Sequence, residues 1–278
     1  MLKLENLFKD TQYVNAQDMP HISEVDIEGN GYHLFGNILT PGAEYQGKHP
    51  CVIMSHGFPG YTTNNDIEHA LRRMGCVVVH VNHRGAWGSE DNYFFSNLTG
   101  DIELIVKWIL SQESIDKFNI DKDNLFLVGH SMGGMTVINA TRKLKNIRGT
   151  VAIAPYDLDY GFRTGTENDL KEMIHEEGNC LKLTSEEELF EDARKNSKVL
   201  SIPEAADDLK ERNILFVGAD CDDIAPPQNM IEPLFSRLEQ SGSEPYHEYV
   251  LLHTDHSLCG SRIQLANTIG EWIVKLIK

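Results

Sequence analysis

Residues 125–134 read LFLVGHSMGG, and this stretch decides the fold. Its first four residues form an apolar run suited to a buried strand, and residues 131–144 carry a helical pattern. Between the two lies a G-x-S-x-G motif made by Gly129, Ser131 and Gly133. The motif predicts a sharp strand-to-helix turn whose flanking glycines leave no space for a Cβ. Such a turn lifts the Ser131 hydroxyl above a sheet, in front of the N–H donors of the next helix.

Strand-like and helical patterns alternate along the rest of the chain, as is typical of an α/β protein with a parallel sheet. We expect strands at residues 21–28, 32–39, 51–54, 76–81, 125–128, 150–154, 214–217 and 248–252. We expect helices at residues 66–74, 101–110, 131–144, 227–241 and 263–277. The Asn30-Gly31 pair favours a hairpin between the first two strands.

Residues 156–211 break the alternation, since they contain no convincing buried strand. They hold 16 acidic and 7 basic residues, a net charge of −9 out of −17 for the whole chain. The spacing Thr184-x-x-Glu187 predicts a capping box that opens one helix, and Pro203 predicts the start of another at residues 203–210.

This region is interpreted as a helical cap inserted between the sixth and seventh strands. The catalytic core would then comprise residues 1–155 and 212–278, and the cap residues 156–211. The alternative is a surface insertion with no role in the site.

Composition excludes several classes of protein. With 41% hydrophobic and 24% charged residues in 278, the chain is expected to fold around a large core. We expect neither a membrane-spanning helix nor a secretory signal, because the sequence has no apolar run of 18 residues and residues 1–10 are charged throughout. A charge of −17 without a Lys/Arg cluster argues against nucleic acid and anionic membranes. Five cysteines without a Cys-x-x-Cys pair fit free thiols in the cytoplasm, while the oligomeric state stays open.

A second glycine-rich segment, HGFPG at residues 56–60, follows the strand expected at residues 51–54. Such a loop can direct a backbone N–H toward Ser131. Two donors would then hold a developing oxyanion, the N–H of Met132 and the N–H of Phe58. His56 is interpreted as a structural residue that orders the loop.

A serine hydroxyl needs an adjacent base to act as a nucleophile. His256 follows the last expected strand and is the candidate base, with His253 as its rival. His253, Asp255 and His256 also suggest a metal site, but no second cluster supports one, so we expect neither metal nor cofactor. The acid that orients the base would come from Asp220, Asp222 or Asp223 after the strand at residues 214–217, or from Asp157.

Together these segments resemble the α/β-hydrolase superfamily. The resemblance rests on HGFPG, on NHRGAWGS at residues 82–89, on GHSMGG, on Ala154-Pro155 and on the Asp-His-Ser ending at Ser257. It implies a mostly parallel eight-stranded sheet with one antiparallel strand and helices on both faces. Because Asp222 lies four residues before Pro226, the family's usual spacing, it also implies the triad Ser131, Asp222 and His256.

Within the superfamily the chain is most similar to feruloyl/cinnamoyl esterases and to the catalytic domains of prolyl-oligopeptidase-like peptidases. It departs from the cinnamoyl esterases in carrying Met132 where they usually have Gln. The resemblance implies a serine hydrolase that cleaves small to medium carboxylic esters through an acyl-enzyme. The aromatic side chains expected to line an acyl pocket, or simply to pack the cap, are Trp87, Tyr156, Tyr160, Phe162 and Phe190.

Three other functions stay open. A peptidase would use the same triad and could anchor a substrate amino terminus on Asp157 or Asp159. An acyl-CoA thioesterase would need a basic entrance, and the expected cap is acidic, so it ranks lower. A non-catalytic binding protein with a hydrolase fold is the alternative of another class.

Overall fold

The computed structural model describes residues 2–10, 15–61, 64–239 and 247–277. Its eight strands form one sheet in the order β1-β2-β4-β3-β5-β6-β7-β8. Strand β2 is antiparallel to both of its neighbours, β1 and β4. The remaining pairs, which join β3 to β8, are all parallel. The strands are β1 His21–Glu28, β2 His33–Thr40, β3 His49–Ser55, β4 Val77–Val81, β5 Ile120–His130, β6 Gly149–Ile153, β7 Ile214–Ala219 and β8 His247–Leu252. The expected mostly parallel sheet with one antiparallel strand is confirmed.

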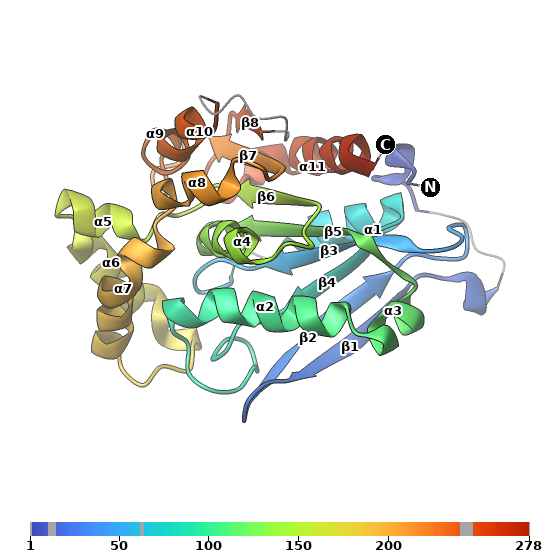
Figure 1. Ribbon diagram of the computed structural model, residues 1–278, viewed down its shortest axis with the longest axis horizontal. Coiled ribbons are helices and arrows are strands. Elements are labelled where there is room, and N and C mark those ends of the chain that lie inside the picture. The colour runs from blue at the N-terminus through green and yellow to red at the C-terminus, as the bar shows by residue number, and fades with distance from the viewer. Residues whose placement is uncertain (1, 11–14, 62–63, 240–246, 278) are drawn as a thin grey trace.

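Helices cover both faces of this sheet (Figure 1). Helices α1 and α11 pack on one face, and α2, α3 and α4 pack on the other. The helices are α1 Asn65–Met74, α2 Leu98–Ile109, α3 Gln112–Phe118, α4 Met132–Lys143, α5 Asp159–Thr164, α6 Glu167–Glu177, α7 Glu186–Leu200, α8 Ala206–Leu209, α9 Pro227–Met230, α10 Glu232–Glu239 and α11 Arg262–Ile277. Within the described residues, no helix combines the length and apolar composition that a membrane span requires.

The central strands are apolar on both faces because helices cover both. In β5, Leu125 and Leu127 pack toward α2, while Phe126 and Val128 pack toward α1 and α11. Side chains alternate between the faces with a period of two, so a strand buried on both sides has no polar position. This is why residues 51–54 of β3 and residues 125–128 of β5 read as short continuous apolar runs, whereas Lys122 and Asp123 near the start of β5 are exposed.

Three expectations about helices need correction. The single helix expected at residues 227–241 is two helices, because Pro233 has no N–H to continue α9 and instead lies in the first turn of α10. Residues 240 and 241 lie outside the described residues. The cap of α7 is Ser185, which accepts a hydrogen bond from the N–H of Glu188 at 3.1 Å, and not Thr184. Helices α3, α5 and α6 were not expected.

Residues 156–211 form α5 to α8 and contain no strand; all of them are described. Figure 1 shows α5, α6 and α7 grouped beyond one end of the sheet. Their apolar side chains, including Leu189, join the same cluster as Met135 and Ile138 of α4. The carboxylate of Asp192 also accepts hydrogen bonds from the N–H and hydroxyl of Ser96. The segment therefore packs on the core directly; its division into a separate cap stays a prediction.

The close packing of α4 on β3 leads to a stability prediction. A Cβ on Gly133 would lie 2.2 Å from the carbonyl oxygen of Ser55, a backbone atom that cannot move aside. We expect Gly133→Ala to lower the free energy of unfolding by about 3 kcal/mol or more. Gly100→Ala is the matched control, because Gly100 also lies in a helix and its Cβ would meet no atom closer than 3.6 Å.

We expect Gly100→Ala to raise the free energy of unfolding by ~0.5–1 kcal/mol, since alanine loses less backbone entropy in a helix. Urea unfolding of the two variants and the wild type measures both effects. Equal stability of Gly133→Ala and wild type would show that α4 does not pack on β3 as described.

Candidate active site

Ser131 lies on the turn between β5 and α4, with φ 56° and ψ −121°. Few residues other than glycine adopt a positive φ. The turn is held from outside: the N–H of Ser131 donates to the carbonyl of Ile153 at 2.9 Å, and its carbonyl accepts from Tyr156 N at 3.0 Å. A Cβ on Gly129 would lie 2.1 Å from the carbonyl oxygen of Gly133. The glycines of the motif are therefore required by contact with backbone.

His256 and Asp222 complete a chain of hydrogen bonds that starts at Ser131. The Nε2 atom of His256 lies 2.9 Å from Ser131 Oγ, and its Nδ1 atom lies 2.7 Å from Asp222 Oδ2. A carboxylate only accepts, so Nδ1 carries the proton and Nε2 is free to accept from the serine hydroxyl. The three residues follow β5, β7 and β8, whose carboxyl ends meet at one edge of the sheet.

The surroundings of Asp222 keep it ionised. Burial of this side chain favours its neutral form, but the hydrogen bond and charge of His256 and two backbone donors outweigh burial and lower its pKa. Those donors are the N–H groups of Ile224 at 3.0 Å and Ala225 at 2.7 Å, both to Oδ1. An ionised Asp222 holds the His256 ring in one tautomer and stabilises its cation.

The rival candidates lie elsewhere. His253 is exposed and pairs with Asp220 through a contact of 2.8 Å between Nδ1 and Oδ2. Asp223 is exposed and lines the second cavity beside Ser131, while the carboxylate that contacts His256 is that of Asp222. The structure thus brings Asp222, and neither of its neighbouring aspartates, to His256.

Asp157 and Asp159 are also engaged away from the serine. Both carboxylates pair with Arg163, at 2.6 Å and 3.0 Å, and both side chains are buried. Asp157 Oδ1 also accepts a hydrogen bond from Ile202 N at 3.0 Å. The expectation that either could anchor a substrate amino group is therefore wrong, because both are buried and share the Arg163 guanidinium.

The HGFPG loop passes directly against the serine. A Cβ on Gly57 would lie 3.1 Å from Ser131 Cβ, so a larger residue would push the loop away. Phe58 follows and lines the cavity in front of Ser131. Met132 is the first residue of α4, and the N–H groups of a first helical turn have no partner within the helix. The oxyanion roles of Phe58 and Met132 stay predictions.

Two buried histidines fix the loops around the site. His56 donates from Nδ1 to the carbonyl of Gly57 at 2.8 Å and accepts at Nε2 from His83 N at 3.2 Å. Burial lowers its pKa well below the usual value, so it is neutral. These contacts agree with its interpretation as a structural residue.

His130 was not expected to contribute. Its Nε2 donates to the carbonyl oxygen of His256 at 2.8 Å, which fixes the backbone that carries the base. Burial and the neighbouring His256 lower the pKa of His130 to about 4, so above that pH it adds no charge beside the base. Its position inside the G-x-S-x-G motif, directly before Ser131, was the feature of the sequence that could have indicated this role.

A cavity of about 380 Å³ opens in front of Ser131, and a second of about 420 Å³ adjoins it. The two share three lining residues, Met173, Glu177 and Ile224. The first is also lined by Phe58, Tyr61, Ser131 and His256, and the second by Tyr156, Tyr160, Asp169, Glu172 and Glu176. We call the two together the serine groove.

Three of the five aromatic residues expected to line an acyl pocket, Trp87, Phe162 and Phe190, do not line this groove. Trp87 donates from Nε1 to the carbonyl of Pro59 at 2.9 Å and packs on Tyr61, so it supports the HGFPG loop from behind. Phe162 packs on Phe190 inside the insert, with ring centroids 5.7 Å apart. Only the other two, Tyr156 and Tyr160, line the groove. Sequence patterns cannot show which face of a loop an aromatic ring occupies.

Carboxylates of α6 make the groove acidic, which sequence reasoning did not assign to particular residues. Glu177 lines both parts of the groove. Burial and the neighbouring Glu176 raise its pKa, while His256 opposes the rise. The groove therefore combines an apolar floor beside Ser131 with negative charge on the side of the insert.

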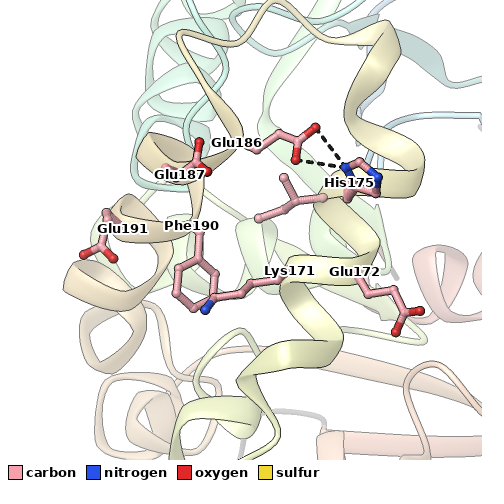
Figure 2. Close-up of a pocket in the computed structure, with 8 residues that line it drawn as sticks. Lys171, Glu172, His175, Glu186, Glu187, Phe190 and Glu191 are labelled. Atoms are coloured by element: carbon pink, nitrogen blue, oxygen red, sulfur yellow. Dashed lines mark hydrogen bonds and ion pairs between the residues drawn. The ribbon is translucent and has the colours of Figure 1, made fainter.

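Another cavity, of about 450 Å³, lies within the insert between α6 and α7. Figure 2 shows His175 and Glu186 turned toward each other across it, and their closest contact is 3.1 Å. Lys171 lies over the ring of Phe190 on the same side. Ser131 is not among its lining residues, so this cavity is separate from the serine groove.

The sheet order, the serine turn and the hydrogen-bonded Ser131, His256 and Asp222 define an α/β-hydrolase. Residues 64–278 match the prolyl oligopeptidase family, and the chain belongs to this family.

Among curated proteins the chain is similar to monoglyceride lipase from Rattus norvegicus, with 25% identity over 146 residues. The match covers 52% of this chain and 45% of the lipase, so it spans less than half of that relative. Among solved structures it resembles a puromycin hydrolase, with a TM-score of 0.70 and 16% identity over 96% of this chain and 41% of that one. An esterase from Pyrococcus furiosus gives a TM-score of 0.68 and 16% identity over 96% and 98% of the two chains.

The hydrogen bond between Asp222 and His256 can be tested by the reactivity of Ser131. We expect Asp222→Asn to slow labelling of the protein by a fluorophosphonate by about 10⁴-fold, because the amide favours the wrong tautomer of the base. Asp223→Asn, one residue along, should label within about threefold of wild type, as for surface substitutions. Rapid labelling of Asp222→Asn together with a silent Asp223→Asn would move the acid to Asp223.

Proposed function

We propose that this protein is a serine hydrolase that cleaves small to medium carboxylic esters through an acyl-enzyme. The observation that carries the proposal is the pair of hydrogen bonds of His256, 2.9 Å to Ser131 Oγ and 2.7 Å to Asp222 Oδ2. A base within hydrogen-bonding distance of the hydroxyl, itself oriented by a buried carboxylate, is the arrangement that activates a serine.

In the proposed first step, Ser131 Oγ attacks the ester carbonyl carbon while its proton passes to His256 Nε2. The negative oxygen that forms is held by the N–H groups of Phe58 and Met132. Loss of one such donor costs about 3 kcal/mol of transition-state stabilisation in enzymes of this type. The tetrahedral intermediate then collapses, the C–O bond to the alcohol breaks, and His256 gives its proton to that alcohol.

In the second step, water attacks the acyl-enzyme and gives its proton to His256 Nε2. The same N–H groups hold the second oxyanion. Collapse breaks the bond to Ser131 Oγ, which regains its proton from His256 as the carboxylic acid leaves. No cofactor is needed, because every proton that leaves the nucleophile returns through one imidazole.

An ester is the favoured substrate for two reasons. The floor of the serine groove is apolar where it meets Ser131, with Phe58, Met173 and Ile224, and suits an acyl group. The lipase, which is similar to part of this chain in sequence, and the Pyrococcus furiosus esterase, which is similar in fold, are named for acting on esters.

The proposed cellular location is the reducing cytoplasm. The five cysteines, all free and two of them exposed, support this location.

A peptidase is the second candidate, and two observations favour it. The chain belongs to the prolyl oligopeptidase family. In addition, Glu176 and Glu177 line the groove and could accept a cationic amino terminus, the role that Asp157 and Asp159 cannot fill.

Labelling and turnover test the proposal together. We expect the wild type to react with a fluorophosphonate and to hydrolyse p-nitrophenyl butyrate, and Ser131→Ala to do neither. Ser23→Ala, on the edge strand β1, is the control and should behave as wild type. Faster turnover of aminoacyl-p-nitroanilides than of esters would favour the peptidase. Labelling that persists in Ser131→Ala would remove the nucleophile, and a protein that neither labels nor hydrolyses would be a binding protein.

The acidic side of the groove predicts a preference for cationic substrates. We expect Glu176→Gln/Glu177→Gln to lower kcat/KM for an ester bearing an ammonium group about tenfold, a loss of about 1.4 kcal/mol. The value for a neutral ester of the same size should stay within about twofold. The two carboxylates attract the ammonium group and not the neutral ester, so their removal lowers kcat/KM only for the charged substrate.

The control for this experiment is Glu186→Gln/Glu187→Gln. This variant also removes two negative charges from the insert, but they lie at the separate cavity between α6 and α7. It should leave both esters unchanged. If the two double variants have equal effects on the cationic ester, the preference comes from the overall charge of the protein and not from the groove.

A further inference from the structure

Three metal-binding side chains meet just beyond the ends of β7 and β8. The two strands pair in parallel up to Ala219 and Leu252. Asp220 and Cys221 follow the first strand, and His253 follows the second. One ligand atom from each of the three lies within 4.8 Å of the others, and all three residues are exposed. None of them has a role in the proposed reaction.

The distances between these atoms already approach those of a tetrahedral zinc site. Zn–N and Zn–O bonds near 2.0–2.1 Å and a Zn–S bond near 2.3 Å place neighbouring ligand atoms roughly 3.3–3.6 Å apart. Cys221 Sγ lies 3.3 Å from Asp220 Oδ1 and 3.9 Å from His253 Nδ1. His253 Nδ1 lies 2.8 Å from Asp220 Oδ2. Cys221 and His253 contact different oxygens of the Asp220 carboxylate, and one ligand atom from each of the three residues lies within 4.8 Å of the others.

The backbone holds the three side chains in register. Asp220 N donates to Leu252 O at 3.0 Å, and Cys221 N donates to Thr254 O at 3.1 Å. A third bond runs from Thr254 N to Asp220 Oδ1 at 3.3 Å. The ligands therefore sit at the ends of two paired strands, and a site on such elements needs little ordering to bind.

We propose that Asp220, Cys221 and His253 form a binding site for a divalent metal ion of the zinc type. A thiolate, an imidazole and a carboxylate together suit Zn²⁺, whereas Ca²⁺ and Mg²⁺ prefer oxygen ligands alone. On binding, the Cys221 thiol releases its proton to solvent, and His253 presents the Nδ1 lone pair with its proton on Nε2. Three protein ligands leave the fourth position for water.

This trio differs from the one that the sequence suggested. His256 is bound to Ser131 and Asp222. Asp255 accepts hydrogen bonds through Oδ1 from Cys259 N and the Thr254 hydroxyl. Instead of Asp255 and His256, the pairing of β7 with β8 brings Asp220 and Cys221 next to His253. Because these two residues are about thirty positions earlier in the chain, no local spacing could show the site.

The position gives metal binding a structural consequence. Cys221 directly precedes Asp222, and His253 lies three residues before His256. A bound ion would link the two loops that carry these residues through coordinate bonds. It would stabilise the folded protein, because it binds the native arrangement of two strands and not the unfolded chain.

Cobalt is the probe for the site, used with untagged, reduced, full-length protein freed of metal. We expect Co²⁺ to bind the wild type with a stoichiometry of one and to give a sulfur-to-cobalt charge-transfer band, which one equivalent of Zn²⁺ then removes. Cys221→Ser should lose the band, and His253→Asn should weaken binding at least tenfold. Cys259→Ser and His175→Asn are matched controls, an exposed cysteine and an exposed histidine paired with a carboxylate, and should bind as wild type.

Thermal unfolding provides a readout that does not depend on activity. We expect Zn²⁺ to raise the Tm of wild type and Cys259→Ser, but not of Cys221→Ser. Circular dichroism in the absence of metal should show the same fold for all variants, since the altered side chains are exposed. Absence of a charge-transfer band in the wild type, or an equal band in Cys221→Ser, would overturn the site without affecting the proposed hydrolysis.

Discussion

The contact between the serine turn and strand β3 is the constraint on which the rest of the site depends. Ser131 holds a positive φ only because β6 and α4 fix the turn on both sides. Gly133 allows α4 to approach the carbonyl of Ser55, and Gly57 allows the next loop to approach Ser131. The strain of one residue is offset by packing around it, and that packing sets where the hydroxyl points.

Strand order then brings together groups that are far apart in the chain. The loops after β3, β5, β7 and β8 all open at the same edge of the sheet. This edge collects Phe58, Ser131, Asp222 and His256, and α6 of the insert lies over it with Glu177. Direct contacts couple these loops, since His130 Nε2 donates to the carbonyl of His256 and Gly57 packs against Ser131.

The sequence predicted what local rules control. Short buried strands and the glycine turn at Ser131 follow from hydrophobic runs and from steric limits near the backbone, whereas the eight-stranded sheet with one antiparallel strand was implied by the resemblance to α/β-hydrolases. It did not predict where Trp87 and Phe162 lie, because the direction of a side chain depends on tertiary packing. The cap of α7 was misplaced by one residue, since Thr184 and Ser185 both precede a run of glutamates.

The spacing to Pro226 indicated Asp222 as the acid, and the structure shows what distinguishes it physically from Asp220. The loops after β7 and β8 form two Asp–His pairs of almost equal length, Asp220 with His253 at 2.8 Å and Asp222 with His256 at 2.7 Å. The lengths of the two contacts do not separate the pairs, but burial does. The side chain of Asp222 is 0% exposed and that of Asp220 is 38% exposed. Water screens the outer pair, so its charges are available to solvent and ions, whereas the inner pair acts on Ser131 through a direct hydrogen bond.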